Sequence, residues 1–157
     1  MKNIITILPR RPWPPYAGQS RLAYYRSKEL KKNNYNTTLI WFDFFTNNLS
    51  KSELYKLKKA YKIIKKIDIN FLDLFFIFFN ALKNRIFKKT PLQASLIDSP
   101  LIKKKINSYF KSIDADEKKN YIIHCYSIRT YSIWRQLNEI KINFVLDLVD
   151  SMKLNIN

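Results

Sequence analysis

The chain has 157 residues, of which 46% are hydrophobic and 26% charged, and it carries a formal net charge of +17 at pH 7. These values disfavour a disordered chain and allow one domain with a core, since a domain of about 150 residues buries roughly 68–70% of the surface that its unfolded chain exposes. The single cysteine, Cys125, excludes an intramolecular disulfide. No apolar run reaches the about 20 residues of a membrane-spanning helix, and the first run, residues 3–8, is too short for a signal peptide. We therefore expect a cytoplasmic protein.

The positive charge has three competing explanations. A basic surface binds the phosphates of nucleic acid, or it binds anionic lipid, where each Lys or Arg near the surface contributes about 1 kcal/mol. The third is a composition bias, because Lys, Asn, Ile, Tyr and Phe are abundant together while glycine occurs once. Bias takes the largest weight and leaves open a peripheral position at the inner face of a membrane. We expect no nucleic-acid partner, because no recognition module is visible.

The first forty residues predict a β-α-β unit. Residues 3–8 form a β-branched, apolar run that is typical of a buried strand. Residues 9–19 contain four prolines and the only glycine, so they form a loop. Ser20 caps a helix over residues 21–32, and residues 35–42 form a second strand. Such a unit implies a parallel sheet with a right-handed crossover.

The middle of the chain predicts two helices of different character. The run from Ser50 to Glu53 is a capping box that opens a basic helix over residues 51–66, and a short strand follows at 67–70. Residues 71–87 form a very apolar, phenylalanine-rich helix that ends in a basic patch. The two helices together suit a membrane-facing surface, but we expect the phenylalanine run to be buried in the core.

The last third returns to alternating elements. Ser99 and Pro100 start a helix that extends to residue 113. A turn, a strand, a helix and a strand follow at residues 114–117, 121–126, 128–139 and 142–148. No internal repeat or linker divides the chain, so we expect residues 1–157 to form one α/β domain, a Rossmann-like, three-layer fold around a parallel sheet.

Gly18 and the helix after it form a first candidate site. Glycine permits positive φ and the close approach of another group, and the free N–H groups of a helix N-terminus attract anions. Arg21, in the first turn, adds a charge-assisted hydrogen bond to a phosphate. An ordinary loop glycine with a solvated arginine explains these residues about equally well, since no dinucleotide-binding or P-loop pattern is present.

His124, Asp147 and Asp150 form a second candidate site. His124 is the only histidine and lies near the carboxyl end of a predicted strand, where ligands gather in parallel sheets, although a structural role is commoner for a lone histidine. Asp147 and Asp150 flank the end of the last strand and suit hydroxyl binding or general-base chemistry, with helix capping as an equal alternative. Cys125 and His124 lack the partners of a metal site, so we expect no metal or other cofactor.

Four segments, in order, resemble bacterial glycosyltransferases of the family 4 type. They are residues 7–22, with the proline-glycine loop, 90–100, 122–130 and 145–152. The similarity spans nearly the whole chain. It implies the N-terminal, acceptor-side half of a GT-B fold, in which two Rossmann-like domains enclose the active site.

The resemblance implies transfer of a sugar from a nucleotide-sugar donor to a glycan or lipid-linked acceptor, without a bound metal. The matching positions are Gly18 and Arg21 for the donor diphosphate, Gln19 and Arg129 for the substrate, and His124, Asp147 and Asp150 for catalysis.

The chain departs from the family's pattern in the loop, at the last motif and at its end. Ala17 takes the place of the first of two loop glycines, and Lys153 takes the place of a serine. No donor-binding domain follows by Asn157, and catalysis needs both walls of the cleft. We therefore expect that this chain alone transfers no sugar, unless a separate donor-binding chain joins it. The alternative is a basic, non-enzymatic α/β protein with an anionic membrane surface as its partner.

Overall fold

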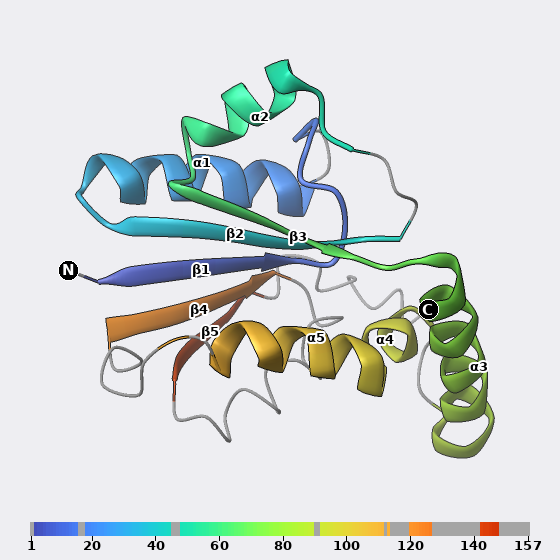
Figure 1. The fold of residues 1–157 in the computed structure, drawn as a ribbon. Helices are drawn as coiled ribbons and strands as arrows, with labels where there is room; N and C mark the ends of the chain where they lie inside the picture. The colour runs from blue at the N-terminus through green and yellow to red at the C-terminus, as the bar shows by residue number, and fades with distance from the viewer. Residues whose placement is uncertain are drawn as a thin grey trace, which may run out of the picture.

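The computed structural model describes residues 2–15, 18–44, 48–89, 92–111, 113, 120–126 and 142–147. Its centre is a five-stranded sheet of order β3-β2-β1-β4-β5, in which every neighbouring pair is parallel (Figure 1). The strands are β1 (Asn3–Leu8), β2 (Asn36–Asp43), β3 (Ile63–Asp68), β4 (Tyr121–Tyr126) and β5 (Asn143–Asp147). This confirms the predicted α/β, Rossmann-like fold.

Helices cover both faces of the sheet. Figure 1 shows α1 (Gly18–Lys32) and α2 (Lys51–Lys58) on one face and α5 (Pro100–Lys111) on the other. Successive residues of a strand point to opposite faces, so Ile7 of β1 packs toward α5 while Leu8 packs toward α1 and α2. The central strands are buried on both faces, which explains their continuous apolar runs.

The predicted basic helix over residues 51–66 and the strand at 67–70 are wrong in extent. The Ser50–Glu53 capping box is present, but α2 ends at Lys58, and β3 begins at Ile63. β3 pairs with β2 and forms an edge of the sheet. An edge strand tolerates exposed lysines, so the Lys-rich sequence forms a strand because β2 offers it a hydrogen-bonding partner.

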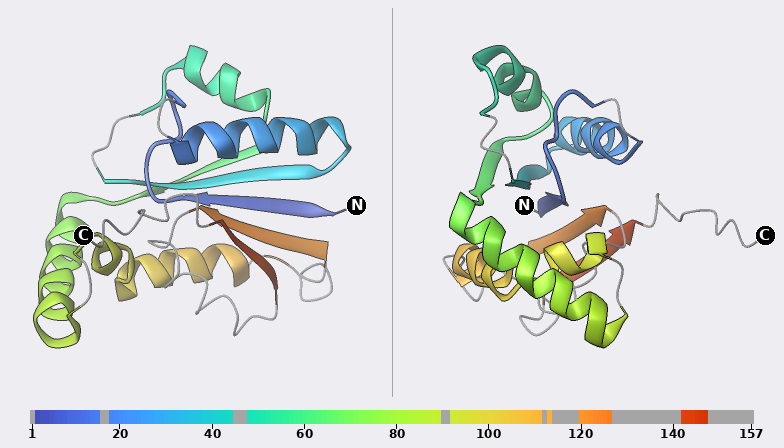
Figure 2. Two further views of the ribbon diagram at one scale, coloured as in Figure 1. Left: turned by 180° about the vertical axis from the view of Figure 1, so that it is seen from behind. Right: turned by 90° about the vertical axis from the view of Figure 1, so that its right-hand side faces the viewer.

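The remaining helices lie between β3 and β4 in the sequence. α3 (Phe71–Lys88) stands across the carboxyl ends of the strands, and α4 (Leu92–Ile97), which the sequence did not predict, lies beside it (Figure 2). α5 starts at Pro100 as predicted and ends at Lys111. The predicted turn at 114–117 and the predicted helix at 128–139 lie outside the described residues.

Candidate functional site

A capping box and an ion pair fix the start of α3. The Asn70 side-chain oxygen accepts a hydrogen bond from the backbone N–H of Asp73 at 2.7 Å, and the Asp73 carboxylate accepts one from the backbone N–H of Asn70 at 3.1 Å. Lys105 of α5 donates to the same carboxylate at 2.6 Å. This bond, followed by the one from Asn70, holds the pKa of Asp73 below its usual value. The orientation of α3 is therefore anchored at its first turn.

Most of the apolar side chains of α3 are exposed. Ile77 and Ala81 are fully buried against the protein. Nine others are exposed: Phe71, Leu72, Phe75, Phe76, Phe78, Phe79, Leu82, Ile86 and Phe87. The expectation that the phenylalanine run is buried in the core is therefore wrong. α3 stands beyond the end of the sheet (Figure 2), and its buried residues Ile77, Ala81 and Asn84 form one narrow stripe.

The exposed apolar surface of α3 is large for a domain of this size. Its six phenylalanines are each between 56% and 82% exposed. At roughly 200 Å² per aromatic side chain, they present on the order of 700–800 Å². The largest apolar patch on an ordinary monomer is about 300–600 Å², and larger patches mark protein or membrane interaction sites. α3 is thus the strongest candidate for a functional surface.

Two cations, Lys83 and Arg85, border most of this apolar surface, and Phe76 and Phe87 lie just beyond Lys83. At about 100° per residue, Lys83 and Arg85 lie about 160° apart around the helix. Seven exposed apolar residues fall between them: Phe71, Leu72, Phe75, Phe78, Phe79, Leu82 and Ile86. We call these seven residues the apolar arc. Neither cation has a carboxylate partner within salt-bridge distance in the described part of the chain, and Asp73, held by Lys105, is the only acidic residue of the helix.

An apolar cleft adjoins the arc. It has a volume of about 490 Å³ and is lined by Phe44 after β2, by Leu96 of α4 and by Phe71, Leu74, Phe75 and Phe78 of α3. All six lining side chains are hydrocarbon, so the described part of the cleft offers no side-chain hydrogen bond and no charge. Its place at the carboxyl ends of the strands is where α/β sheets commonly bind ligands.

The residues proposed around Gly18 lie at the start of α1. Gly18 is the first helical residue and is exposed, Gln19 is buried and Arg21 is exposed. The φ of Gly18 is not positive, and a Cβ added there would meet no protein atom within 4 Å. The glycine therefore fulfils no backbone requirement within the described protein.

The structure brings His124 and Asp147 together and adds Arg26 of α1. Arg26 Nη1 donates to Asp147 Oδ2 at 2.5 Å and lies 3.1 Å from His124 Nε2, which is itself 3.5 Å from Asp147 Oδ2. The imidazole stacks on the ring of Tyr126, with 4.2 Å between the centroids. No sequence motif pointed to Arg26, since it lies 98 residues from His124. The predicted site residues Arg129 and Asp150 lie outside the described residues.

The surroundings of His124 favour its neutral form. Burial, and next the positive charge of Arg26, lower its pKa, while Asp147 opposes them. Because the Arg26 guanidinium only donates hydrogen bonds, His124 Nε2 accepts from it, which places the imidazole proton on Nδ1. Burial also raises the pKa of Tyr126 to about 12. The cluster is a compact set of mutually satisfied charges, and it suits a structural role.

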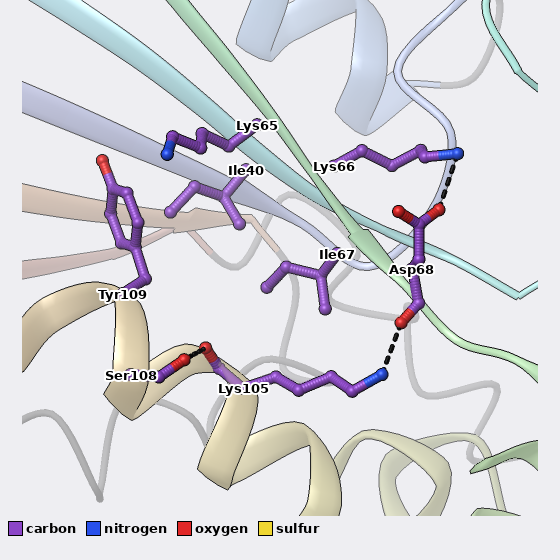
Figure 3. Close-up of a pocket in the computed structure, with 8 residues that line it drawn as sticks. All are labelled: Ile40, Lys65, Lys66, Ile67, Asp68, Lys105, Ser108 and Tyr109. Atoms are coloured by element: carbon purple, nitrogen blue, oxygen red, sulfur yellow. Dashed lines mark hydrogen bonds and ion pairs between the residues drawn. The ribbon is translucent and has the colours of Figure 1, made fainter.

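A second cavity of about 490 Å³ lies between β3 and α5 (Figure 3). It contains three lysines, but two of them are bound to protein oxygens. Lys66 pairs with Asp68 at 2.6 Å, and Lys105 donates to the Asp68 backbone oxygen at 2.6 Å. Lys65 lies over the ring of Tyr109, 5.4 Å from its centroid. The carboxylates thus offset much of the positive charge, and the cavity is a weak candidate for an anion site.

Comparisons with known proteins identify no family for this chain. No family model matches it, and no curated protein matches its sequence. Among solved structures, it is similar to the C-terminal domain of a hydrogenase from Pyrococcus furiosus, with a TM-score of 0.54 and 17% identity over 94% of this chain and 91% of that one. It is also similar to a predicted subunit of a tRNA methyltransferase from Methanocaldococcus jannaschii, with a TM-score of 0.50 and 14% identity over 96% of this chain and 70% of that one. At these identities the likeness shows the fold alone.

These findings contradict the glycosyltransferase resemblance. The structural neighbours are a hydrogenase domain and a predicted methyltransferase subunit, and no sequence comparison supports glycosyl transfer. The predicted GT-B assignment, the sugar-transfer function, and the nucleotide-sugar and glycan partners are therefore wrong. The four sequence segments misled because a strand followed by a loop and a helix recurs throughout α/β folds, whatever their function.

Proposed function

We propose that this α/β domain binds peripherally to a membrane surface through α3. The observation that supports the proposal is the apolar arc, an exposed hydrocarbon surface with a cation on each side. An interfacial helix lies in the plane of the membrane, with its apolar face buried about 5–10 Å below the headgroups and its cations among them. Lys and Arg extend their charged ends toward the headgroups while their stems cover apolar surface.

The energies favour such binding. Transferring a phenylalanine or leucine side chain from water to an apolar environment contributes about 1.5–3 kcal/mol, and the arc presents seven apolar side chains. Each cation near an anionic surface adds about 1 kcal/mol, and the whole chain carries a net charge of +17. No helix in the described part of the chain is long and apolar enough to cross a membrane. We therefore propose that α3 lies on the membrane surface.

Vesicle flotation tests this proposal with residues of the arc that do not line the cleft. Leu72 and Phe79 are 68% and 65% exposed, so Leu72→Ser/Phe79→Ser removes apolar surface only. The wild type should float with vesicles of phosphatidylcholine and phosphatidylserine, and less with phosphatidylcholine alone. The double variant should bind about tenfold more weakly or worse, because two apolar insertions are lost.

A matched control uses exposed aromatics away from α3. Tyr25→Ser/Tyr55→Ser removes rings that are 52% and 66% exposed on α1 and α2, and it should float like the wild type. Equal loss in both double variants would overturn the proposal, as would a wild type that stays unbound with every vesicle. Binding of tRNA that neither vesicles nor the α3 substitutions diminish would instead assign the positive charge to nucleic acid.

A further inference from the structure

We infer that the apolar cleft between α3, α4 and Phe44 holds the acyl chain of an anionic membrane amphiphile, a ligand that would reach it from the surface on which the proposed function places α3. The cleft and the apolar arc share some residues, but each also has residues of its own, so the two can be tested separately. Leu96, Leu74 and Phe44 line the cleft but do not belong to the arc, while Leu72 and Phe79 belong to the arc but do not line the cleft.

The lining of the cleft selects a flexible hydrocarbon. With a volume of about 490 Å³, it lies within the usual range of about 300–1,000 Å³ for small-molecule sites. A polar ligand would lose its hydrogen bonds to water there and gain none from these side chains, so its polar groups oppose binding. If a methylene fills about the volume of one water, near 30 Å³, the cleft has room for on the order of ten of them.

A cation lies in line with the cleft. The α3 wall of the cleft is Phe71, Leu74, Phe75 and Phe78, and the 3.6-residue repeat continues this stripe through Leu82 to Arg85. Arg85 lies about 10 Å along the helix axis beyond Phe78, at 1.5 Å per residue. It is exposed and has no carboxylate within salt-bridge distance in the described chain. Its guanidinium suits a carboxylate or phosphate head, because it donates two parallel hydrogen bonds.

Among the described residues, the first turn of α3, where the stripe begins, offers no such free charge. There Asp73 is bound to Lys105 at 2.6 Å and to the backbone of Asn70. The stripe therefore runs from Phe71 at the first turn of α3, past the hydrocarbon cleft, to Arg85, a cation with no carboxylate partner among the described residues, while the Asp73–Lys105 ion pair lies on another side of the helix. This polarity matches an amphiphile whose tail enters the cleft and whose anionic head lies toward Arg85. A second copy of the chain would place its own positive charge, +17 in total, against the same cation.

The test is a titration with cis-parinaric acid, a fatty acid whose fluorescence rises in apolar surroundings, in solution without vesicles. The wild type should bind it saturably at one site. Leu96→Trp, which fills the cleft from α4, should weaken binding at least tenfold and leave vesicle flotation unchanged. Leu72→Ser/Phe79→Ser should do the reverse. The two patterns separate failure of this inference from failure of the proposed membrane binding.

Two further variants test the wall of the cleft and the role of Arg85 separately. Phe44→Ala removes another wall of the cleft, so it should also weaken binding if Leu96→Trp proves unstable by circular dichroism. Arg85→Glu should weaken binding of the fatty acid and not of the corresponding fatty alcohol, because only the acid presents a negative head. The inference would be overturned if the wild type shows no saturable binding. It would also be overturned if Leu96→Trp and Phe44→Ala both bind the fatty acid as tightly as the wild type does. Binding of the alcohol that equals binding of the acid would overturn the role of Arg85.

Discussion

The contacts of His124 make the free energy of unfolding depend on pH in a predictable direction. Its pKa in the folded protein lies below the unfolded value of about 6.5, mainly because of burial and then of Arg26. Above pH 6.5 the imidazole is neutral in both states and folding keeps its full stability. As the pH falls below 6.5, the unfolded chain binds a proton that the folded chain does not, so the free energy of unfolding decreases until the folded pKa is passed.

Urea unfolding between pH 7.5 and pH 5 measures this effect. His124 is the only histidine, and most carboxylates titrate below this range, so comparison with a His124 variant isolates its contribution. His124→Gln should remove the pH dependence even if it lowers stability at pH 7.5. A wild type whose stability rises toward pH 5 would mean that the Asp147 carboxylate outweighs burial and Arg26.

Gly18 provides a second prediction for a single residue. Its φ is not positive, and an added Cβ has open space around it. Gly18→Ala should therefore stabilise the domain by about 0.4–1 kcal/mol, because alanine restricts the unfolded chain and suits a helix. Thermal unfolding followed by circular dichroism measures the change. A lower melting temperature would show that an interaction outside the described residues requires the glycine.

For helices and strands, local sequence predicted those whose apolar pattern fits a strand buried on both faces. The strands at Asn3–Leu8 and Tyr121–Tyr126 have the predicted bounds, because short, β-branched apolar runs are typical of parallel strands buried on both faces. The segment after Lys58 was predicted as helix, and it forms β3 because β2 leaves an open edge. Pairing across the sheet is a tertiary effect that propensity does not contain.

α3 shows the same limit for the candidate site. The sequence predicted its helix, its apolar character and its basic end, but burial of its phenylalanines was the wrong expectation. A helix that is apolar over most of its circumference is usually buried. Only the position of α3 beyond the end of the sheet decides that its arc faces outward, and the contacts there, such as the ion pair between Asp73 and Lys105, come from a distant segment.

Over the whole molecule, alternating strands and helices were sufficient to predict the three-layer fold, and they were insufficient to predict function. Many unrelated activities share such folds, and the residues that distinguish them come from distant segments. Arg26 reaches His124 and Asp147 from another layer of the domain. The apolar cleft combines residues of three segments, around Phe44, α3 and Leu96. Neither the Arg26 cluster nor the apolar cleft corresponds to a motif of fixed spacing, so neither can be read from one sequence.

The exposed arc also determines how the whole molecule behaves in solution. Leu72→Ser/Phe79→Ser should leave the melting temperature nearly unchanged, because substitutions at exposed positions usually alter stability by no more than about 0.5 kcal/mol. The same variant should associate less with itself, since large apolar patches promote aggregation in water. Thermal unfolding and light scattering at matched concentrations measure the two effects. A melting temperature that falls by more than the about 2–4 °C expected for 1 kcal/mol in a domain of this size would show that these side chains are buried in solution, and α3 would then have no free surface to offer a membrane.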